Sequence, residues 1–382
     1  MRTCRVITVF PMLALLLALM LILNPIESKA GNTIEAEPDS FVTHPVLSRR
    51  SWFLIPIAFY QEETSVGFGA TFGYYFKSNS LQKISSCSGS VIYTVLNQAK
   101  INFNPRFYSK DKQWYFTGNV QLRYYPDKYY GIGNMVDDST WLYTSMSVSA
   151  NFQPFWNCGK GWQIGPRADV RAEKVLVGQS FEADRAHIYS EYGETGWSPY
   201  CVWGLGAQVM YDGRDNQYYP YQFSSFFKFG YMAYLQAWGS DYTMHRFSAD
   251  FRQYVPTALG QVFAWQLCAE VGVGDQIPFE MLPALGGSDL LRGFRERRYT
   301  DNSLVALQAE YRIPVYGRLK AVLLAGVGDV FDVNNLQIHK LKVGYGGGLR
   351  FRLNDARVHL RVDLTGNNYG EFKFYITATE AF

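Results

Sequence analysis

The chain of 382 residues is 48% hydrophobic and 17% aromatic, with a formal net charge of +3 at pH 7. Its mean hydropathy of -0.14 is too polar for a bundle of transmembrane helices, and the small net charge argues against a nucleic-acid partner. Tyr, Phe and Gly are abundant, with 28, 27 and 34 residues. Such a composition fits a membrane β-barrel, in which apolar and polar positions alternate. A large secreted β-sandwich or β-propeller shares this composition, so only the order of the residues can distinguish these classes from a membrane β-barrel.

Residues 1–30 are predicted to be a signal peptide. Arg2 and Arg5 precede an apolar run from Val6 to Leu23, and residues 28–30 (Ser-Lys-Ala) offer a cleavage site with small residues at both ends. Because the apolar run is long, an uncleaved membrane anchor is the alternative. No later stretch reaches the roughly 18 unbroken apolar residues of a spanning helix. We therefore expect an exported protein that spans a membrane with strands.

Residues 31–51 are polar and far fewer than the roughly 50 residues of a small domain, so we interpret them as a short periplasmic lead. Residues 52–382 form the predicted barrel domain, because apolar and polar residues alternate there with a period of two. The alternation predicts about sixteen strands, an even number as single-chain outer-membrane barrels require. The predicted strands are 52–60, 66–76, 88–97, 100–109, 113–124, 141–155, 161–177, 200–211, 221–235, 242–255, 261–272, 304–313, 318–331, 341–351, 356–364 and 372–382.

The predicted connections alternate between short and long. Short turns on the periplasmic side and long loops outside are typical of an outer-membrane barrel, whereas a soluble sandwich has no reason to sort its loops in this way. The short connections are 155–160, 255–259, 313–317 and 353–356, and the long ones are 126–139, 180–199 and 274–300. The sequence therefore predicts an all-β, transmembrane, antiparallel β-barrel in the outer membrane of a Gram-negative bacterium.

One face of the predicted strands is apolar and the other is charged. A charge on the lipid face at mid-membrane costs about 2–4 kcal/mol, so we expect the charged face to line the lumen. There the last strands contribute a predicted basic cluster that would favour anions. Its members are Lys342, Arg350, Arg352, Arg357 and Arg361.

The stretch 286–299 is too charged for a lipid-facing strand and lies between two segments that alternate cleanly. Gly286, Gly287 and Gly293 permit backbone shapes that other residues resist. Arg292 stands between Leu291 and Phe294, which indicates a loop that folds inward rather than a solvated tip. We expect this loop to lie in the lumen, between strands eleven and twelve.

At residues 286–294 the chain resembles the BamA/TamA family of outer-membrane proteins (the bacterial surface antigen superfamily). Gly286-Gly287-Ser288 followed by Leu291-Arg292-Gly293-Phe294 is similar to that family's Arg-Gly-Phe/Tyr loop motif, and the resemblance covers nearly all of 52–382. Weaker similarities lie at 63–69, at 211–215 and in the Glu-Ala-Phe ending. The best-known members carry periplasmic POTRA domains, and the sequence predicts none here.

The resemblance implies that the loop arginine meets acidic residues of neighbouring strands. The expected loop-lock motif is Arg292, Gly293 and Phe294 with Glu310, which projects inward from the strand after the loop. The family's second acid is replaced by Gly326. Asp329 is the possible secondary partner, although its parity is opposite and it needs a bulge to face inward. A solvated Arg292 without a partner is the alternative.

Catalytic motifs, metal-ligand spacings and phosphate-binding loops are absent from the sequence, so we expect neither an enzyme nor a cofactor or metal. The expected partner is outer-membrane lipid, together with client outer-membrane or secreted proteins and periplasmic or lipoprotein partners. We expect a monomer.

Two classes of function remain open. The first is a BamA-like component that inserts or translocates proteins or lipids through a weak seam between the first and last strands. Pro56 in the first strand removes a ladder donor at this seam, unless it occupies an edge position where that donor faces no partner. Phe382 ends the predicted closing strand, where a terminal aromatic suits recognition by the insertion machinery. The second class is a transport pore, or a translocator for a separately encoded partner.

Overall fold

A computed structural model describes the chain from residue 50 onward with short gaps. The described ranges are 50–61, 65–76, 84–111, 113–136, 141–177, 195–258, 260–332, 340–354, 356–378 and 380–382. The predicted signal peptide and residues 31–49 of the predicted lead lie outside these ranges.

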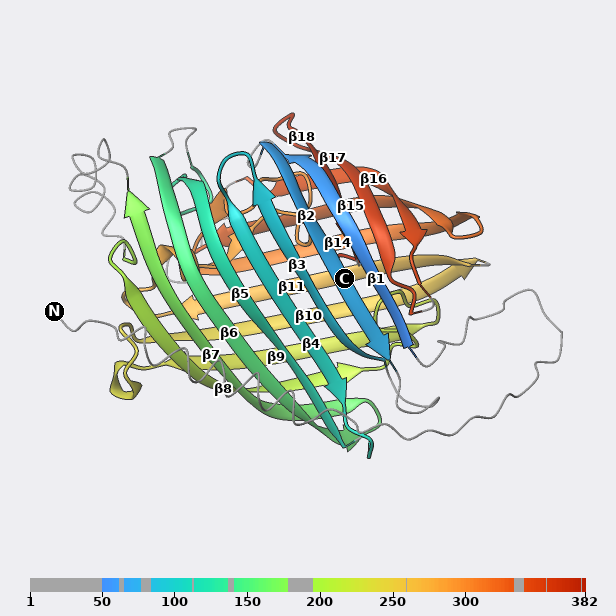
Figure 1. Ribbon diagram of the computed structural model, residues 1–382, viewed down its shortest axis with the longest axis horizontal. Coiled ribbons are helices and arrows are strands. Elements are labelled where there is room, and N and C mark those ends of the chain that lie inside the picture. Colours follow the sequence, from blue (N-terminus) through green and yellow to red (C-terminus); the bar gives the residue numbers. More distant parts are fainter. Residues whose placement is uncertain are drawn as a thin grey trace. The chain divides into compact units, whose positions relative to one another are not determined.

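Sixteen strands form one antiparallel sheet, in which neighbouring strands follow one another along the chain (Figure 1). A separate two-stranded hairpin, β12–β13, lies in the connection between β11 and β14. The strands are β1 (Arg50–Gln61), β2 (Ser65–Phe76), β3 (Ser85–Thr94), β4 (Ala99–Tyr108), β5 (Trp114–Tyr129), β6 (Trp141–Gly159), β7 (Trp162–Val177), β8 (Tyr200–Asp212), β9 (Ser224–Tyr234), β10 (Met244–Ala258), β11 (Gln261–Val273), β12 (Ala284–Leu285), β13 (Tyr299–Thr300), β14 (Ser303–Tyr316), β15 (Leu319–Phe331), β16 (Lys342–Arg352), β17 (His359–Asn367) and β18 (Phe372–Ala378). Two short 3-10 helices are η2 (Gln236–Trp238) and η3 (Phe279–Met281). Within the described ranges no helix is long and apolar enough to cross a membrane.

The period-two pattern of the sequence appears in the exposure of the side chains. In the register of β11 with β14, Leu267 pairs with Leu307 and Gln266 pairs with Gln308. The two leucines are exposed, whereas the two glutamines are buried and hydrogen-bonded to each other at 2.7 Å. An exposed apolar face is the one that lipid covers in a membrane barrel, so the polar face lines the interior.

The predicted number of sixteen strands in the sheet is confirmed. Strand β5 continues to Tyr129, so the connection expected at 126–139 starts later than predicted. β17 begins at His359 rather than at residue 356.

The predicted closing strand 372–382 is wrong at its end, because β18 stops at Ala378. Phe382 is buried against Tyr254 and Val262 on β10 and β11. The guanidinium of Arg312 donates a hydrogen bond to the carbonyl of Phe382 at 3.0 Å and lies 5.5 Å from its ring. Contact with a buried cation therefore holds Phe382 in the interior, away from the predicted seam.

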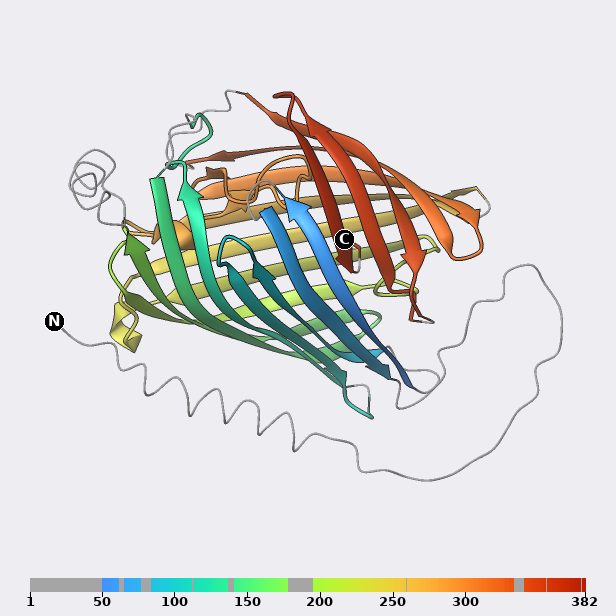
Figure 2. The same cartoon turned by 45° about the horizontal axis from the view of Figure 1, so that its top comes forward.

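The two edge strands, β1 and β18, come near each other as the sheet curls (Figure 2). Along the described residues of these two strands, no hydrogen-bonded ladder joins them. β1 has 12 residues and β18 has 7, so part of β1 has no residue of β18 with which to pair. Pro56 lies on β1 opposite Ala70 in an unbroken register with β2. An edge strand is where a sheet tolerates proline, as the alternative interpretation of Pro56 requires.

Replacing Leu267 by arginine is expected to destabilise the protein by about 2–4 kcal/mol, because a charge near the middle of the lipid face loses its hydration. Leu267→Ala is the matched control, since it removes apolar surface without adding a charge. Urea unfolding in phospholipid vesicles, followed by tryptophan fluorescence, measures both variants. Equal unfolding midpoints for the two variants would contradict a lipid-facing Leu267.

Candidate functional site: an interior loop held by buried ion pairs

The connection between β11 and β14, residues 274–302, folds back against the inner face of the sheet; we call it the interior loop (Figure 2). Its two arms pair in the hairpin β12–β13. Leu291 and Phe294 are each 1% exposed and belong to an apolar cluster with Leu304 and Val330 of β14 and β15. The apolar residues that flank Arg292 therefore fix the loop against the wall of the sheet.

Arg292 lies at the centre of the interior loop and is 2% exposed. Its guanidinium contacts the carboxylate of Glu310 on β14 at 2.7 Å and that of Asp363 on β17 at 2.8 Å. A planar guanidinium presents its N–H groups as a fork, so it can bridge two acids from different strands. Since three steps in the sheet separate β14 from β17, this one side chain ties the loop to a broad section of the wall.

The backbone around Arg292 is fixed as well. Gly293 has a φ of 106°, and a Cβ there would lie 2.6 Å from the carbonyl oxygen of Gly366. Asn367 donates a hydrogen bond from its amide to the carbonyl of Gly293 at 2.8 Å. The glycine of the predicted motif is therefore required both by its left-handed conformation and by the close approach to β17.

Asp329, the expected secondary partner, is not the second acid. Its pairing with β14 is regular, without the expected bulge, and its fully buried carboxylate pairs with Lys342 at 2.7 Å. Gly326, which stands where the resemblance places an acid, leaves room for the loop. A Cβ at Gly326 would lie 3.0 Å from Cδ1 of Leu291. The prediction of Asp329 is therefore wrong, and Asp363 supplies the second carboxylate.

The glycines of β16 make the approach of Arg292 to β17 possible. A Cβ at Gly344 would lie 2.1 Å from the carbonyl oxygen of Arg292, and one at Gly348 would lie 2.0 Å from Oδ1 of Asp363. Any other residue at these two positions would displace the loop backbone or the carboxylate. The geometry of the loop therefore requires glycine at these two interior positions.

Four arginines and four carboxylates meet around the tip of the interior loop, which we call the tip cluster. Its arginines are Arg292, Arg312, Arg350 and Arg361, and its acids are Glu310, Asp363, Glu380 and Asp289. Glu310 contacts Arg312 at 2.8 Å and Arg350 at 3.2 Å, and Arg350 also contacts Glu380 at 2.7 Å. Only Asp289 of the eight is exposed. The formal charges cancel, which avoids the large cost of an isolated charge in the interior.

The predicted basic cluster of the last strands is not an unpaired positive surface. Lys342, Arg350 and Arg361 each pair with carboxylates, and Arg357 pairs with Asp215 at 2.9 Å. Arg352, at the end of β16, is partly exposed. These basic residues are paired because acids of neighbouring strands and of the interior loop lie on the same face of the sheet. Anion selectivity therefore has no support from these residues.

The structure describes the weaker similarities to the BamA/TamA family to different extents. Arg214, in the segment 211–215, pairs with Asp212 at 2.9 Å, and Asp215 pairs with Arg357. The segment is thus an ion-paired turn next to the β16–β17 connection. Residues 63 and 64 of the other similarity lie outside the described ranges.

A second ion cluster holds the other arm of the interior loop, with the charges reversed. Glu280 in η3 is 2% exposed and contacts Arg123 on β5 at 3.1 Å and Arg171 on β7 at 3.4 Å. Arg297 lies 3.7 Å away, and the hydroxyl of Tyr143 donates a hydrogen bond at 2.5 Å. Burial by itself raises the pKa of Glu280, but the three guanidinium groups outweigh it and hold this pKa well below its usual range.

Sequence reasoning missed Glu280 and the role of Asp363. Arg123 and Arg171 have interior parity in the predicted strands and already have partners on β5 and β7, Asp127 and Glu173, so no pattern in the sequence indicated that the loop provides a further carboxylate. The loop residue that supplies it could not be named, because the path of the loop is set by tertiary contacts. Phe279, next to Glu280, is buried with Tyr129 and Trp197, which seats η3 at this position.

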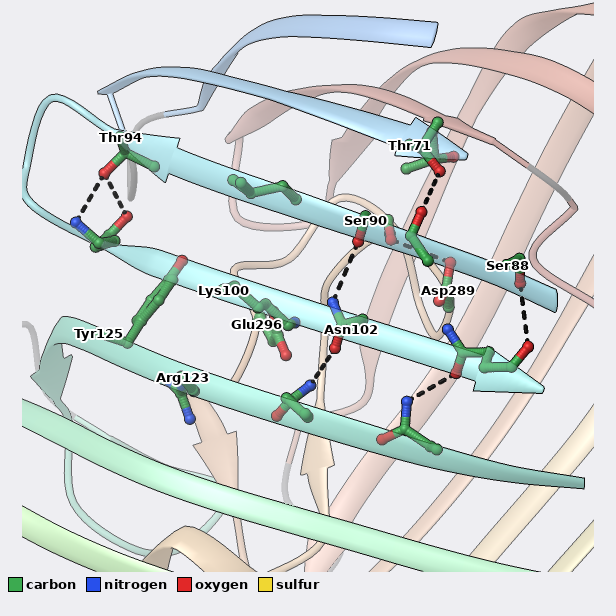
Figure 3. Close-up of a pocket in the computed structure, with 18 of the residues that line it drawn as sticks. Thr71, Ser88, Ser90, Thr94, Lys100, Asn102, Arg123, Tyr125, Asp289 and Glu296 are labelled. Atoms are coloured by element: carbon green, nitrogen blue, oxygen red, sulfur yellow. Dashed lines mark hydrogen bonds between the residues drawn. The ribbon is translucent and has the colours of Figure 1, made fainter. Parts of the chain in front are cut away.

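A cavity of about 610 Å³ lies between the interior loop and strands β2–β5. Amide and hydroxyl side chains cross these strands in hydrogen-bonded pairs (Figure 3). Gln121 donates to Asn102 at 2.8 Å, Asn119 donates to Asn104 at 2.7 Å, and Asn102 donates to Ser90 at 3.4 Å. This wall is mostly uncharged, in contrast to the ion-paired wall of β14–β17.

Comparison with models of known families identifies the family of this chain. The model of the Omp85 superfamily domain matches residues 57–382, which is most of the chain. The chain belongs to the Omp85 superfamily. Barrels of this superfamily are bacterial outer-membrane proteins. No curated protein matches the sequence significantly.

Three solved structures, one BamA and two CdiB proteins, have a similar fold. BamA from Haemophilus ducreyi lacking POTRA domains 1-3 has a TM-score of 0.57 and 13% identity, over 87% of this chain and 70% of that one. CdiB from Acinetobacter baumannii has a TM-score of 0.56 and 12% identity, over 87% of this chain and 60% of that one. CdiB from Escherichia coli has a TM-score of 0.56 and 10% identity, over 90% and 62%. This Omp85 chain thus spans about three fifths of each CdiB chain, and the similarities show a shared fold.

The substitution Glu310→Gln is expected to lower the free energy of unfolding by about 3–5 kcal/mol, because Arg292, Arg312 and Arg350 each lose a buried carboxylate. Arg357→Gln is the control, since it removes a partly exposed ion pair and should cost at most about 1 kcal/mol. Heat-modifiable mobility in gel electrophoresis gives the melting temperature of each variant in detergent. Comparable losses in the two variants would contradict a central role for Glu310.

The substitution Glu280→Gln is expected to increase tryptic cleavage of the interior loop several-fold. The arm then loses its ionic attachment to β5 and β7, and opens more often. Trypsin cuts after Arg295 and Arg297, which the folded loop shields. Asp250→Asn, at a partly exposed pair with Arg252 on β10, is the matched control and should leave the cleavage rate unchanged. Cleavage at the wild-type rate in the Glu280 variant would show that its ion pairs do not hold the loop.

Proposed function

We propose that this Omp85 chain inserts polypeptides into the outer membrane, or passes them across it, through the opening between β1 and β18. The observation that carries the proposal is the mismatch of the two edge strands, 12 residues against 7, without a ladder between their described residues. Unpaired backbone N–H and C=O groups are costly in lipid, where water cannot solvate them. An open edge in a membrane wall therefore favours the addition of a strand from another chain.

Strand addition at a free edge is a general mode of peptide recognition, in which main-chain hydrogen bonds provide most of the affinity. β1 offers the longer edge, and the proline at Pro56 limits how firmly another strand can pair along it. We infer that a client strand pairs with β1 temporarily and then leaves. Such a cycle fits a protein that assists the assembly of other barrels.

The interior loop braces the sheet on both sides of this opening. The tip cluster attaches it to β14 and β17, and Glu280 attaches it to β5 and β7. The hydroxyl of Tyr375 on the edge strand β18 is also hydrogen-bonded to the loop backbone at Gly293 and Phe294, both at 3.3 Å. The cavity beside β2–β5 is adjacent to the β1 edge and is lined by hydrogen-bonding groups, both amides and hydroxyls of the strands and charged side chains such as Lys100 and Glu296. These groups suit a polar chain that has not yet reached lipid.

A transport pore is the competing function, and the pairing of its predicted basic residues removes its main support. In planar bilayers we expect small, flickering conductances from a lumen occupied by the interior loop. Large, stable, anion-selective openings would favour the pore instead. Glu280→Gln should lengthen the openings, because one attachment of the loop is lost.

Depletion of the protein in its native host tests the proposed function directly. We expect the amounts of other outer-membrane proteins to fall several-fold, as measured by quantitative mass spectrometry of isolated outer membranes. Re-expression of the wild-type chain should restore them, whereas Glu310→Gln should restore them only partly. Unchanged outer-membrane protein levels after depletion would rule out a general insertion role.

A further inference from the structure

A groove of about 630 Å³ crosses the lipid-facing surface of strands β5–β9. Trp114 and Trp156 form one side of it, and Phe229 forms the other. Pro166 and Ala207 lie in its floor, where the residues are too small to reach the height of the aromatic rims. All five side chains have the lipid-side parity of their strands, so the groove belongs to the surface that the membrane covers.

The groove coincides with an interruption in the sheet. In the β6–β7 register, Pro154 comes opposite Pro166. Between residues 152 and 156 of β6 no ladder pairs join the two strands, although both strands are described in full. Neither proline has an N–H to donate. A Cβ at Gly165 would lie 1.8 Å from the carbonyl oxygen of Pro154, so no larger side chain fits there. The depression is therefore built into the backbone.

Two polar side chains of the lining, Gln208 and Tyr231, each make a hydrogen bond within the protein. The amide of Gln208, which is buried, donates a hydrogen bond from the interior to the carbonyl of Pro166 at 3.2 Å. The hydroxyl of Tyr231 is hydrogen-bonded to Nδ1 of His245 at 2.8 Å. The groove thus presents apolar surface and no hydrogen-bonding amide or phenol to its occupant.

We propose that this groove binds one acyl chain of a membrane phospholipid. The groove is continuous with the lipid-facing surface of the barrel, so hydrocarbon is the medium that meets it. It lies at the end of the strands next to the β6–β7 turn, where Trp114 and Trp156 are placed as in the aromatic belt at the headgroup level. A lipid with its headgroup at that level extends its tail along the floor formed by Pro166 and Ala207.

An acyl chain suits the groove better than a side chain of the protein itself, because a flexible chain can follow an irregular floor without leaving voids. The site is separate from the β1–β18 opening and from the interior loop, so it does not rest on the proposed function.

Filling the groove tests the proposal. Ala207→Trp places a ring over the floor, and Ala309→Trp adds the same ring at a lipid-side position of β14 outside the groove. Native mass spectrometry after exchange into a mild detergent counts the phospholipids that remain bound to each chain. We expect one retained phospholipid on the wild type and on Ala309→Trp, and at least a fivefold loss on Ala207→Trp. Equal retention by the two variants, or none on the wild type, would overturn the proposal.

A second measurement needs no substitution and so does not depend on the folding of a variant. Wild-type protein in detergent micelles is titrated with a phospholipid whose acyl chains carry bromine, which quenches nearby tryptophan. Because Trp114 and Trp156 border the groove, quenching should saturate at one lipid per chain. A linear rise without saturation would indicate only general partitioning into the micelle, and would count against a defined site.

Discussion

The structure depends on one condition, namely that a guanidinium buried inside a membrane barrel must be surrounded by carboxylates. Arg292 meets this condition through Glu310 and Asp363, and the neighbouring arginines are balanced by the remaining acids of the tip cluster. Several features follow from it. The glycines of β16 stay small because the loop backbone and Asp363 occupy their space, and Phe382 turns inward because Arg312 bonds its carbonyl.

The interior loop is attached to two sections of the sheet by ion pairs. On one side the loop provides the cation Arg292 to acids of the wall; on the other it provides the anion Glu280 to Arg123 and Arg171. Each side also has a pair of the reverse sense, Asp289 of the loop with Arg361 and Arg295 of the loop with Asp127. The cavity lies beside the wall between these attachments and the edge strand β1, where pairs of amide side chains join neighbouring strands.

Sequence reasoning succeeded where information is local. The alternation of apolar and polar residues located the strands, and the inward parity of Glu310 on the strand after the loop named one partner of Arg292. It failed where the contact joins distant segments. Asp363 lies 71 residues from Arg292 and three strands away, and Glu280 meets Arg123 across 157 residues. No period or spacing links such pairs, because their distance depends on how the sheet curls and where the loop turns back.

The sequence by itself determined the all-β architecture, the number of strands, the faces of each strand and the family motif around Arg292. These features follow from the two-residue period of a strand and from the cost of a charge in lipid, which act on each segment separately. Only the tertiary structure decided which acid meets which arginine, that the basic residues are neutralised, that Phe382 leaves the edge, and that two prolines open a groove on the outer wall. Each of these depends on the register and curvature of the sheet, which bring together residues that the chain keeps apart.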